Sequence, residues 1–232
     1  MTEDIFALME WIKEKGCTHV AMECTGVYWK PICNLLEIEN IEIPVVNAQH
    51  IKIVPDRKTD VKDAEWIADL LRHGLLNGRY IPDRDQRELR ELVRYRKSLI
   101  GQWAREVNRT QKVLEGCNIK LSSVATDITG VSAKAMLKVI IDGADDTAVV
   151  ARLAKGRMKN KQKEPEKALA GLIGEHQKKL LLTQIEHIEF IDQKIKELGQ
   201  EIEERRRPFD EELALLQTIP GVARRTAEEI GA

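Results

Sequence analysis

Residues 57–74 read Arg-Lys-Thr-Asp-Val-Lys-Asp-Ala-Glu-Trp-Ile-Ala-Asp-Leu-Leu-Arg-His-Gly, and this stretch sets the fold expected of the N-terminal part of the chain. Apolar residues recur at three- and four-residue steps after the first turn, which predicts an amphipathic helix over Asp60–Leu71. Gly74 follows at a position where glycine often ends a helix. Asp60 and Asp63 lie three residues apart in the first turn, so both carboxylates project from one face.

A third carboxylate, Glu23, ends the apolar run of a predicted buried strand, Thr18–Glu23. A strand-end Glu together with an i, i+3 pair of Asp residues can hold a divalent cation for phosphodiester chemistry, because Mg²⁺ prefers oxygen ligands. Helix capping is an alternative explanation of the Asp pair. Asp60 is a favoured N-cap residue, and negative charge stabilises the first turn that Asp63 also occupies. The two explanations are compatible, and the residue types leave both open.

The remaining N-terminal elements alternate between helix and strand. Periodic apolar residues predict helices over Thr2–Lys15 and Trp29–Ile38, and a second short strand over Ile41–Val46. The resulting strand–helix–strand–helix order is typical of a parallel sheet with crossover helices. Aromatic residues make up only 4% of the chain, so we interpret the tryptophans mainly as core anchors. They are Trp11, Trp29, Trp66 and Trp103.

The pattern becomes helical after Pro82. Two long apolar stripes predict helices over Asp83–Glu115 and Glu175–Arg207, and their spacing indicates a coiled coil or an antiparallel helical hairpin. Shorter helices are expected between them, over Val131–Ile141 and Ala148–Leu153. A packing scaffold would explain the stripes equally well.

Charge is distributed unevenly, although the net charge is only −1. Residues 84–115 hold nine basic against five acidic side chains, and residues 151–168 hold seven against two. Local basic patches govern binding to phosphates, so nucleic acid is a candidate partner, with a solvated helix face as the alternative. The run 155–163 contains no aromatic residue, which favours backbone contact over base stacking. The proposed nucleic-acid-binding residues are Arg57, Lys58, Lys62, Lys155, Arg157, Lys159, Lys161 and Lys163.

The cysteines and the hydropathy pattern indicate a cytoplasmic protein. The four cysteines form no C-x-x-C pair and no zinc spacing, so reduced thiols are expected. No apolar run approaches the roughly 18 residues of a membrane span, and the acidic N-terminus is unlike a signal peptide. We therefore expect no membrane partner.

Three segments together are similar to a known family: Met22–Trp29, Val46–His50 and Lys58–Ala64. They resemble the DEDD-type, RuvC-like transposases of IS110 insertion sequences, which are guided by a structured RNA. The resemblance implies an RNase H-like sheet on which Glu23, Asp60 and Asp63 are catalytic, metal-binding carboxylates. It also implies Mg²⁺ as the cofactor, and DNA and a structured guide RNA as partners. The helical region would bind the guide RNA and mediate homo-oligomerisation.

The family pattern also implies a domain organisation. We expect a partial RuvC-like domain over residues 1–82, a helical, coiled-coil-like insert over 83–207, and the start of a C-terminal transposase domain over 208–232. The expected fold class is thus a partial α/β RNase H-like domain followed by a mainly α-helical region. Residues 219–227 resemble a helix-hairpin-helix, whose Gly turn offers backbone N–H groups to a phosphate. An ordinary turn before a helix fits them about as well.

Two functions follow from this resemblance. The family's first Asp, on a strand that precedes the helix Thr2–Lys15, and its C-terminal Ser nucleophile have no counterpart in the sequence. We therefore expect an incomplete chain. The first function is DNA transposition, a site-specific recombination by an RNA-guided transposase. The alternative is a catalytically inactive remnant that binds nucleic acid or dimerises.

Overall fold

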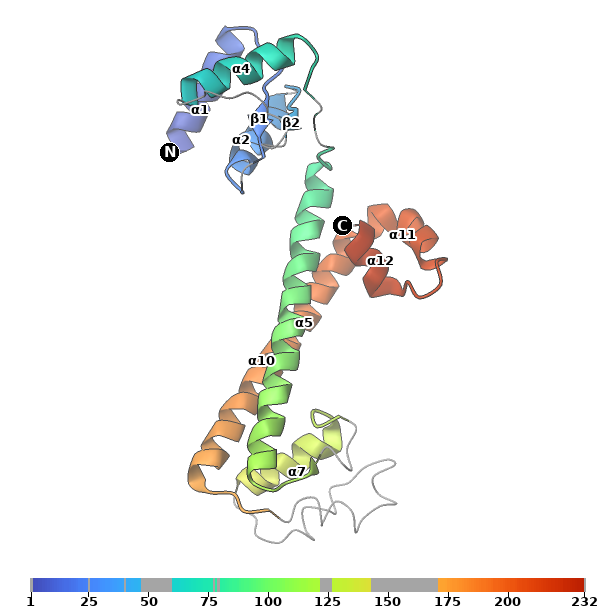
Figure 1. Cartoon of the computed structure of the whole chain (residues 1–232). Coiled ribbons are helices and arrows are strands. Elements are labelled where there is room, and N and C mark those ends of the chain that lie inside the picture. Colours follow the sequence, from blue (N-terminus) through green and yellow to red (C-terminus); the bar gives the residue numbers. More distant parts are fainter. Residues whose placement is uncertain are drawn as a thin grey trace. The chain divides into compact units, whose positions relative to one another are not determined.

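The structure, a computed structural model, describes residues 2–24, 26–39, 41–46, 60–76, 78, 80–121, 127–142 and 171–231. The predicted helix Ala148–Leu153 and the basic run 155–163 lie outside these ranges, as do Arg57 and Lys58. The chain divides into two compact units, residues 1–86 and 87–232 (Figure 1). In chain order, the first unit holds α1 (Thr2–Glu14), β1 (Met22–Glu23), α2 (Trp29–Leu36), the 3-10 turn η1 (Glu37–Glu39), β2 (Val45–Val46) and α4 (Asp60–Arg72).

The first unit contains a parallel pair of strands, β1 and β2, which α2 connects. Their ladder continues on one side, where His19 bridges Glu42 and the Val20 N–H donates to the Glu42 carbonyl over 2.9 Å. Regular pairing is shorter than the predicted strands, in part because Pro44 has no N–H to donate. The predicted parallel crossover is confirmed. Two paired strands do not by themselves establish an RNase H-like sheet, which therefore stays a prediction.

The core of the first unit is small. Its buried apolar residues are Ile12, Cys33, Leu36, Val45 and Val46. The prediction of four tryptophan core anchors is wrong for Trp11, whose exposed fraction is 54%, whereas the other three are partly buried. A two-stranded sheet offers too little area to cover every apolar helix face, which explains why α1 leaves this ring in solvent.

Two long helices form the frame of the second unit: α5 (Arg84–Gly116) and α10 (Glu175–Arg205). Leu89 and Val93, near the start of α5, pack with Ile202 near the end of α10. At the opposite end, Leu114 of α5 and Leu181 of α10 belong to one buried cluster. The residue numbers rise on α5 as they fall on α10, so the predicted antiparallel packing of the two helices is confirmed. Figure 1 shows α5 and α10 lying alongside and crossing each other.

Shorter helices cover the two ends of this helical pair. The remaining elements are α7 (Val131–Ile141), the 3-10 turn η3 (Arg207–Phe209), α11 (Asp210–Gln217) and α12 (Arg224–Gly231). Helix α7, whose predicted bounds are confirmed, contributes Met136 and Leu137 to the cluster around Leu114. Nearby, a Cβ on Gly171 would lie 2.3 Å from the Cys117 carbonyl oxygen, so only glycine allows the Leu172 N–H to reach that oxygen.

Candidate functional site

Glu23 is the last residue of β1, where the sequence pattern predicts it. The register pairs Glu23 with Val46, and the next N–H, that of Cys24, donates to the Val46 carbonyl over 2.9 Å. Its side chain is exposed rather than covered by a helix. Gly26 follows with a φ of +55°, a left-handed conformation that lets the chain turn away from the strand toward α2.

Asp60 and Asp63 lie in the first turn of α4, as predicted. Asp60 is the first helical residue and is exposed, whereas Asp63 is partly buried. Lys62, which is exposed between them, is the one proposed nucleic-acid-binding residue that falls within the described ranges. Glu23, Lys62 and Asp63 each interact with other groups in the structure. The acidic first turn is favourable for the helix, so its stabilising role and a functional role remain compatible.

A divalent metal ion does not fit these carboxylates as the structure places them. Among the described residues, which include Glu23, Asp60 and Asp63, no group of three or more His, Cys, Asp or Glu side chains could hold a metal ion. Helix α4 has no fully buried side chain to fix it tightly within its unit. The catalytic and metal-binding roles of the three residues therefore remain predictions, and no reaction step through Mg²⁺ is derived.

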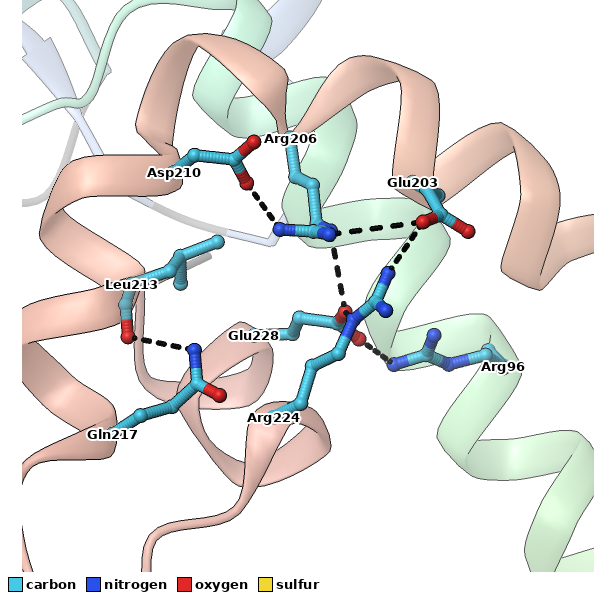
Figure 2. A network of polar contacts seen from close by, with 8 residues as sticks. All are labelled: Arg96, Glu203, Arg206, Asp210, Leu213, Gln217, Arg224 and Glu228. Carbon is cyan, nitrogen blue, oxygen red and sulfur yellow. Dashed lines mark hydrogen bonds and ion pairs between the residues drawn. The ribbon is translucent and has the colours of Figure 1, made fainter.

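A second polar cluster, which the sequence pattern did not predict, lies in the second unit, residues 87–232, here called the helical unit (Figure 2). Its centre is the Glu228 carboxylate on α12, whose exposed fraction is 4%. Arg96 of α5 donates from Nη2 to Glu228 Oε2 over 2.6 Å, and Arg224 donates from Nε to Glu228 Oε1 over 3.2 Å. Arg206 Nε lies 3.6 Å from Glu228 Oε1 and has no hydrogen-bond acceptor. Three guanidinium groups thus converge on one buried carboxylate.

Acidic residues at the edge of this cluster balance its charge. Glu203 lies 2.9 Å from Arg224 Nη2, and Asp210 pairs with Arg206. The hydrogen bond from Arg224 lowers the pKa of Glu203, and the same bond raises the pKa of Arg224. Lys97, next to Arg96 on α5, pairs with Glu229, next to Glu228 on α12. Two consecutive ion pairs thus attach α12 to α5.

The sequence contains one signal that could have revealed this cluster. Arg96 occupies a position in the inner stripe of α5 between Val93 and Leu99, where an apolar residue is expected. A charged residue in such a stripe is rarely fully buried unless it is paired. Its partner, Glu228, is 132 residues away, so spacing along the chain gives no indication of it.

No helix among the described residues combines the length and the apolar character that crossing a bilayer requires.

The four cysteines are free thiols, as expected.

The sequence matches a known protein family. A family model described as Transposase, of the DEDD type associated with IS110, matches residues 1–119. This stretch includes all three predicted carboxylates and the whole of α5. No curated protein matches the sequence.

Proposed function

The chain belongs to the IS110 family of DEDD-type transposases, and we propose that it acts in the RNA-guided, site-specific recombination of DNA. The observation that carries this proposal is the family match over residues 1–119. DNA transposition is the function of the family in general. The guide RNA and the specificity for particular sites belong to the proposal.

In the proposed reaction site, Glu23, Asp60 and Asp63 supply the carboxylates. The strand-end position of Glu23 and the helix-start position of the Asp pair, within one unit, support this assignment. The three residues would act on an RNase H-like sheet of which β1 and β2 form part. Since the described side chains do not gather around a common ion, the roles rest on the family match and on these positions.

The helical unit is proposed to bind guide RNA and to mediate self-association. Exposed apolar side chains on α10 support the second role: Leu180 has an exposed fraction of 48% and Phe190 of 58%. Large apolar side chains in solvent are a feature of association surfaces. The proposal assigns residues 83–207 to this helical part, residues 1–82 to the RuvC-like part and residues 208–232 to the start of the C-terminal domain.

A second candidate function is nucleic-acid binding or dimerisation without chemistry. The observation that favours it is the lack, among the described residues, of a three-carboxylate group that could hold a metal ion. In this case Glu23, Asp60 and Asp63 would only stabilise the fold, the last two through favourable charge at a helix N-terminus.

A recombination assay distinguishes the two candidates. The purified chain is incubated with donor DNA, target DNA and guide RNA, and bound DNA and recombined product are measured in the same samples. The proposed transposase function predicts product once the chain is supplied with the first-strand Asp and the Ser nucleophile of the family pattern, whereas bound DNA without product from that version supports the second candidate. A chain that neither binds DNA, nor forms product, nor dimerises would contradict both.

A further inference from the structure

The two faces of α5 differ in chemistry. The face toward α10 carries Leu89, Val93 and Leu114, which are buried. An α-helix advances 100° per residue, so Arg94, Arg105 and Lys112 all fall on the opposite face, nearly in one line. All three are exposed. Lys97 and Arg109 lie beside this line, with exposed fractions of 66% and 65% for their side chains. These five residues are the outer basic face of α5.

Acidic side chains are few on this face: Glu91 and Glu115 border it, three residues before Arg94 and three after Lys112, and both interact with other groups. Between Glu91 and Glu115, α5 contains a single acidic residue, Glu106, and its side chain is 8% exposed. Arg109 donates to Glu106 over 2.7 Å, and Lys97 pairs with Glu229. Among the residues that the structure describes, no acidic group pairs with Arg94, Arg105 or Lys112.

On helix α10, which is also long and highly charged, four of the five lysine and arginine side chains pair with an acidic residue, and Lys179 does not pair within the described residues. Lys178 lies 2.9 Å from Glu175, Lys194 lies 2.7 Å from Glu197, and Lys196 lies 2.7 Å from Asp192. Pairs at helical spacing neutralise each other locally and are usual for a solvated helix face. Arg94, Arg105 and Lys112 differ in that all three lie in one line along their helix without an acidic partner among the described residues.

We propose that the outer basic face of α5 binds the phosphate backbone of a DNA duplex. At a rise of 1.5 Å per residue, Arg94 and Lys112 are separated by about 27 Å along a straight helix, a length over which duplex DNA presents about 16 phosphates. Gly101 lies near the middle of the face and has no side chain. The Arg105 guanidinium lies over it, since a Cβ there would be 3.5 Å from Arg105 Nη1.

The cations are arranged for contact with a backbone and not for reading bases. No aromatic residue lies in the line through Arg94, Arg105 and Lys112, and the exposed Tyr95 lies about 100° around the helix from it, so base stacking on single strands has no row of platforms there. Phosphate contacts of this kind are independent of sequence and sensitive to salt. The inference rests on the proposed function in one respect: the transposase family acts on DNA, so DNA is the duplex proposed for this face, and the guide RNA is assigned to other surfaces of the helical part.

The test compares two triple variants with equal changes in charge. The first replaces the unpaired cations of α5: Arg94→Gln, Arg105→Gln and Lys112→Gln. The matched control replaces the paired cations of α10: Lys178→Gln, Lys194→Gln and Lys196→Gln. Binding to a short labelled DNA duplex is followed by fluorescence anisotropy at several salt concentrations, and circular dichroism confirms that each variant keeps its helix content.

The α5 variant should bind at least about tenfold more weakly at moderate salt, and the slope of log K against log salt should fall by about 2 to 3, because each phosphate contact contributes about 0.9. The α10 control should match the wild-type slope. A conservative triple variant with Arg94→Lys, Arg105→Lys and Lys112→Arg should retain binding, which excludes a folding defect as the cause.

Three results would overturn the inference: an unchanged slope in the α5 variant, an equal loss in the α10 control, or loss of binding in the conservative variant. Tighter binding of an RNA duplex, lost in the α5 variant, would overturn the choice of DNA. Wild-type chain that binds no DNA would instead contradict the proposed function itself.

Discussion

Replacing Glu228 by Gln tests the buried ion cluster that attaches α12 to α5. The substitution keeps the shape of the side chain but removes the negative charge on which Arg96, Arg206 and Arg224 converge. In the variant, Arg206 would still pair with Asp210, and Arg224 would still pair with Glu203. The Arg96 side chain, which is 8% exposed, would lose its charged partner within the described residues.

The magnitude follows from this loss. Removing one partner of a buried ion pair leaves the other charge uncompensated, which costs about 3–5 kcal/mol. Glu228→Gln should therefore lower the free energy of unfolding of the helical unit by about 3 kcal/mol, since an amide oxygen still accepts a hydrogen bond. The double variant Arg96→Met, Glu228→Met should recover much of this loss, because the buried charge of Arg96 is removed together with its partner.

Urea unfolding followed by circular dichroism measures these differences, and amide hydrogen exchange in residues 224–231 locates them. Glu203→Gln is the control, because Glu203 is exposed at the edge of the same cluster. Equal stability losses in Glu228→Gln and Glu203→Gln would refute the reasoning, as would a double variant that is less stable than the single one.

Three further predictions concern the helical unit. Gly171→Ala should destabilise it by about 1–3 kcal/mol, because the new Cβ would meet the Cys117 carbonyl oxygen at 2.3 Å. Gly199→Ala, in the interior of α10 with nothing within 4 Å, should stabilise it by about 0.5–1 kcal/mol in the same urea measurement, and loss of stability in both would contradict the account. The lowered pKa of Glu203 means that its contribution to stability is present above its ordinary pKa and is lost as the pH falls through the lower value in the folded state. Wild-type protein should thus lose more stability than Glu203→Gln between neutral pH and pH about 3, and equal losses would argue against this pair.

Local sequence signals predicted α1, α2, α4, α5, α7 and α10, but not α11. Long apolar stripes located α5 and α10, and a glycine marked the end of α4, where Gly74 adopts a φ of +67°. The parallel order of β1 and β2 followed from the alternation of elements. The extent of their pairing did not, because it depends on backbone groups such as that of Pro44.

The candidate site was only partly predictable, because its geometry depends on contacts between distant residues. The positions of Glu23 at a strand end and of Asp60 and Asp63 at a helix start follow from local pattern. The distance between β1 and α4 does not follow from local pattern, because α4 has no fully buried side chain whose packing could be predicted. The pairing of Arg96 with Glu228 likewise requires the packing of α12 against α5, which no local pattern encodes.

The most direct test of the central claim separates DNA binding from DNA chemistry in a single reaction. The chain with Glu23→Gln, Asp60→Asn and Asp63→Asn is compared with wild type and with Glu65→Gln, an exposed residue of the same helix α4. Donor and target duplexes and guide RNA are supplied, and both bound DNA and recombined product are quantified. The three proteins are compared both as given and in a version supplied with the first-strand Asp and the Ser nucleophile of the family pattern. The account predicts DNA binding by all of them, and in the supplied version product from the wild type and from Glu65→Gln but none from the triple variant. Product from the triple variant at the wild-type level would contradict it.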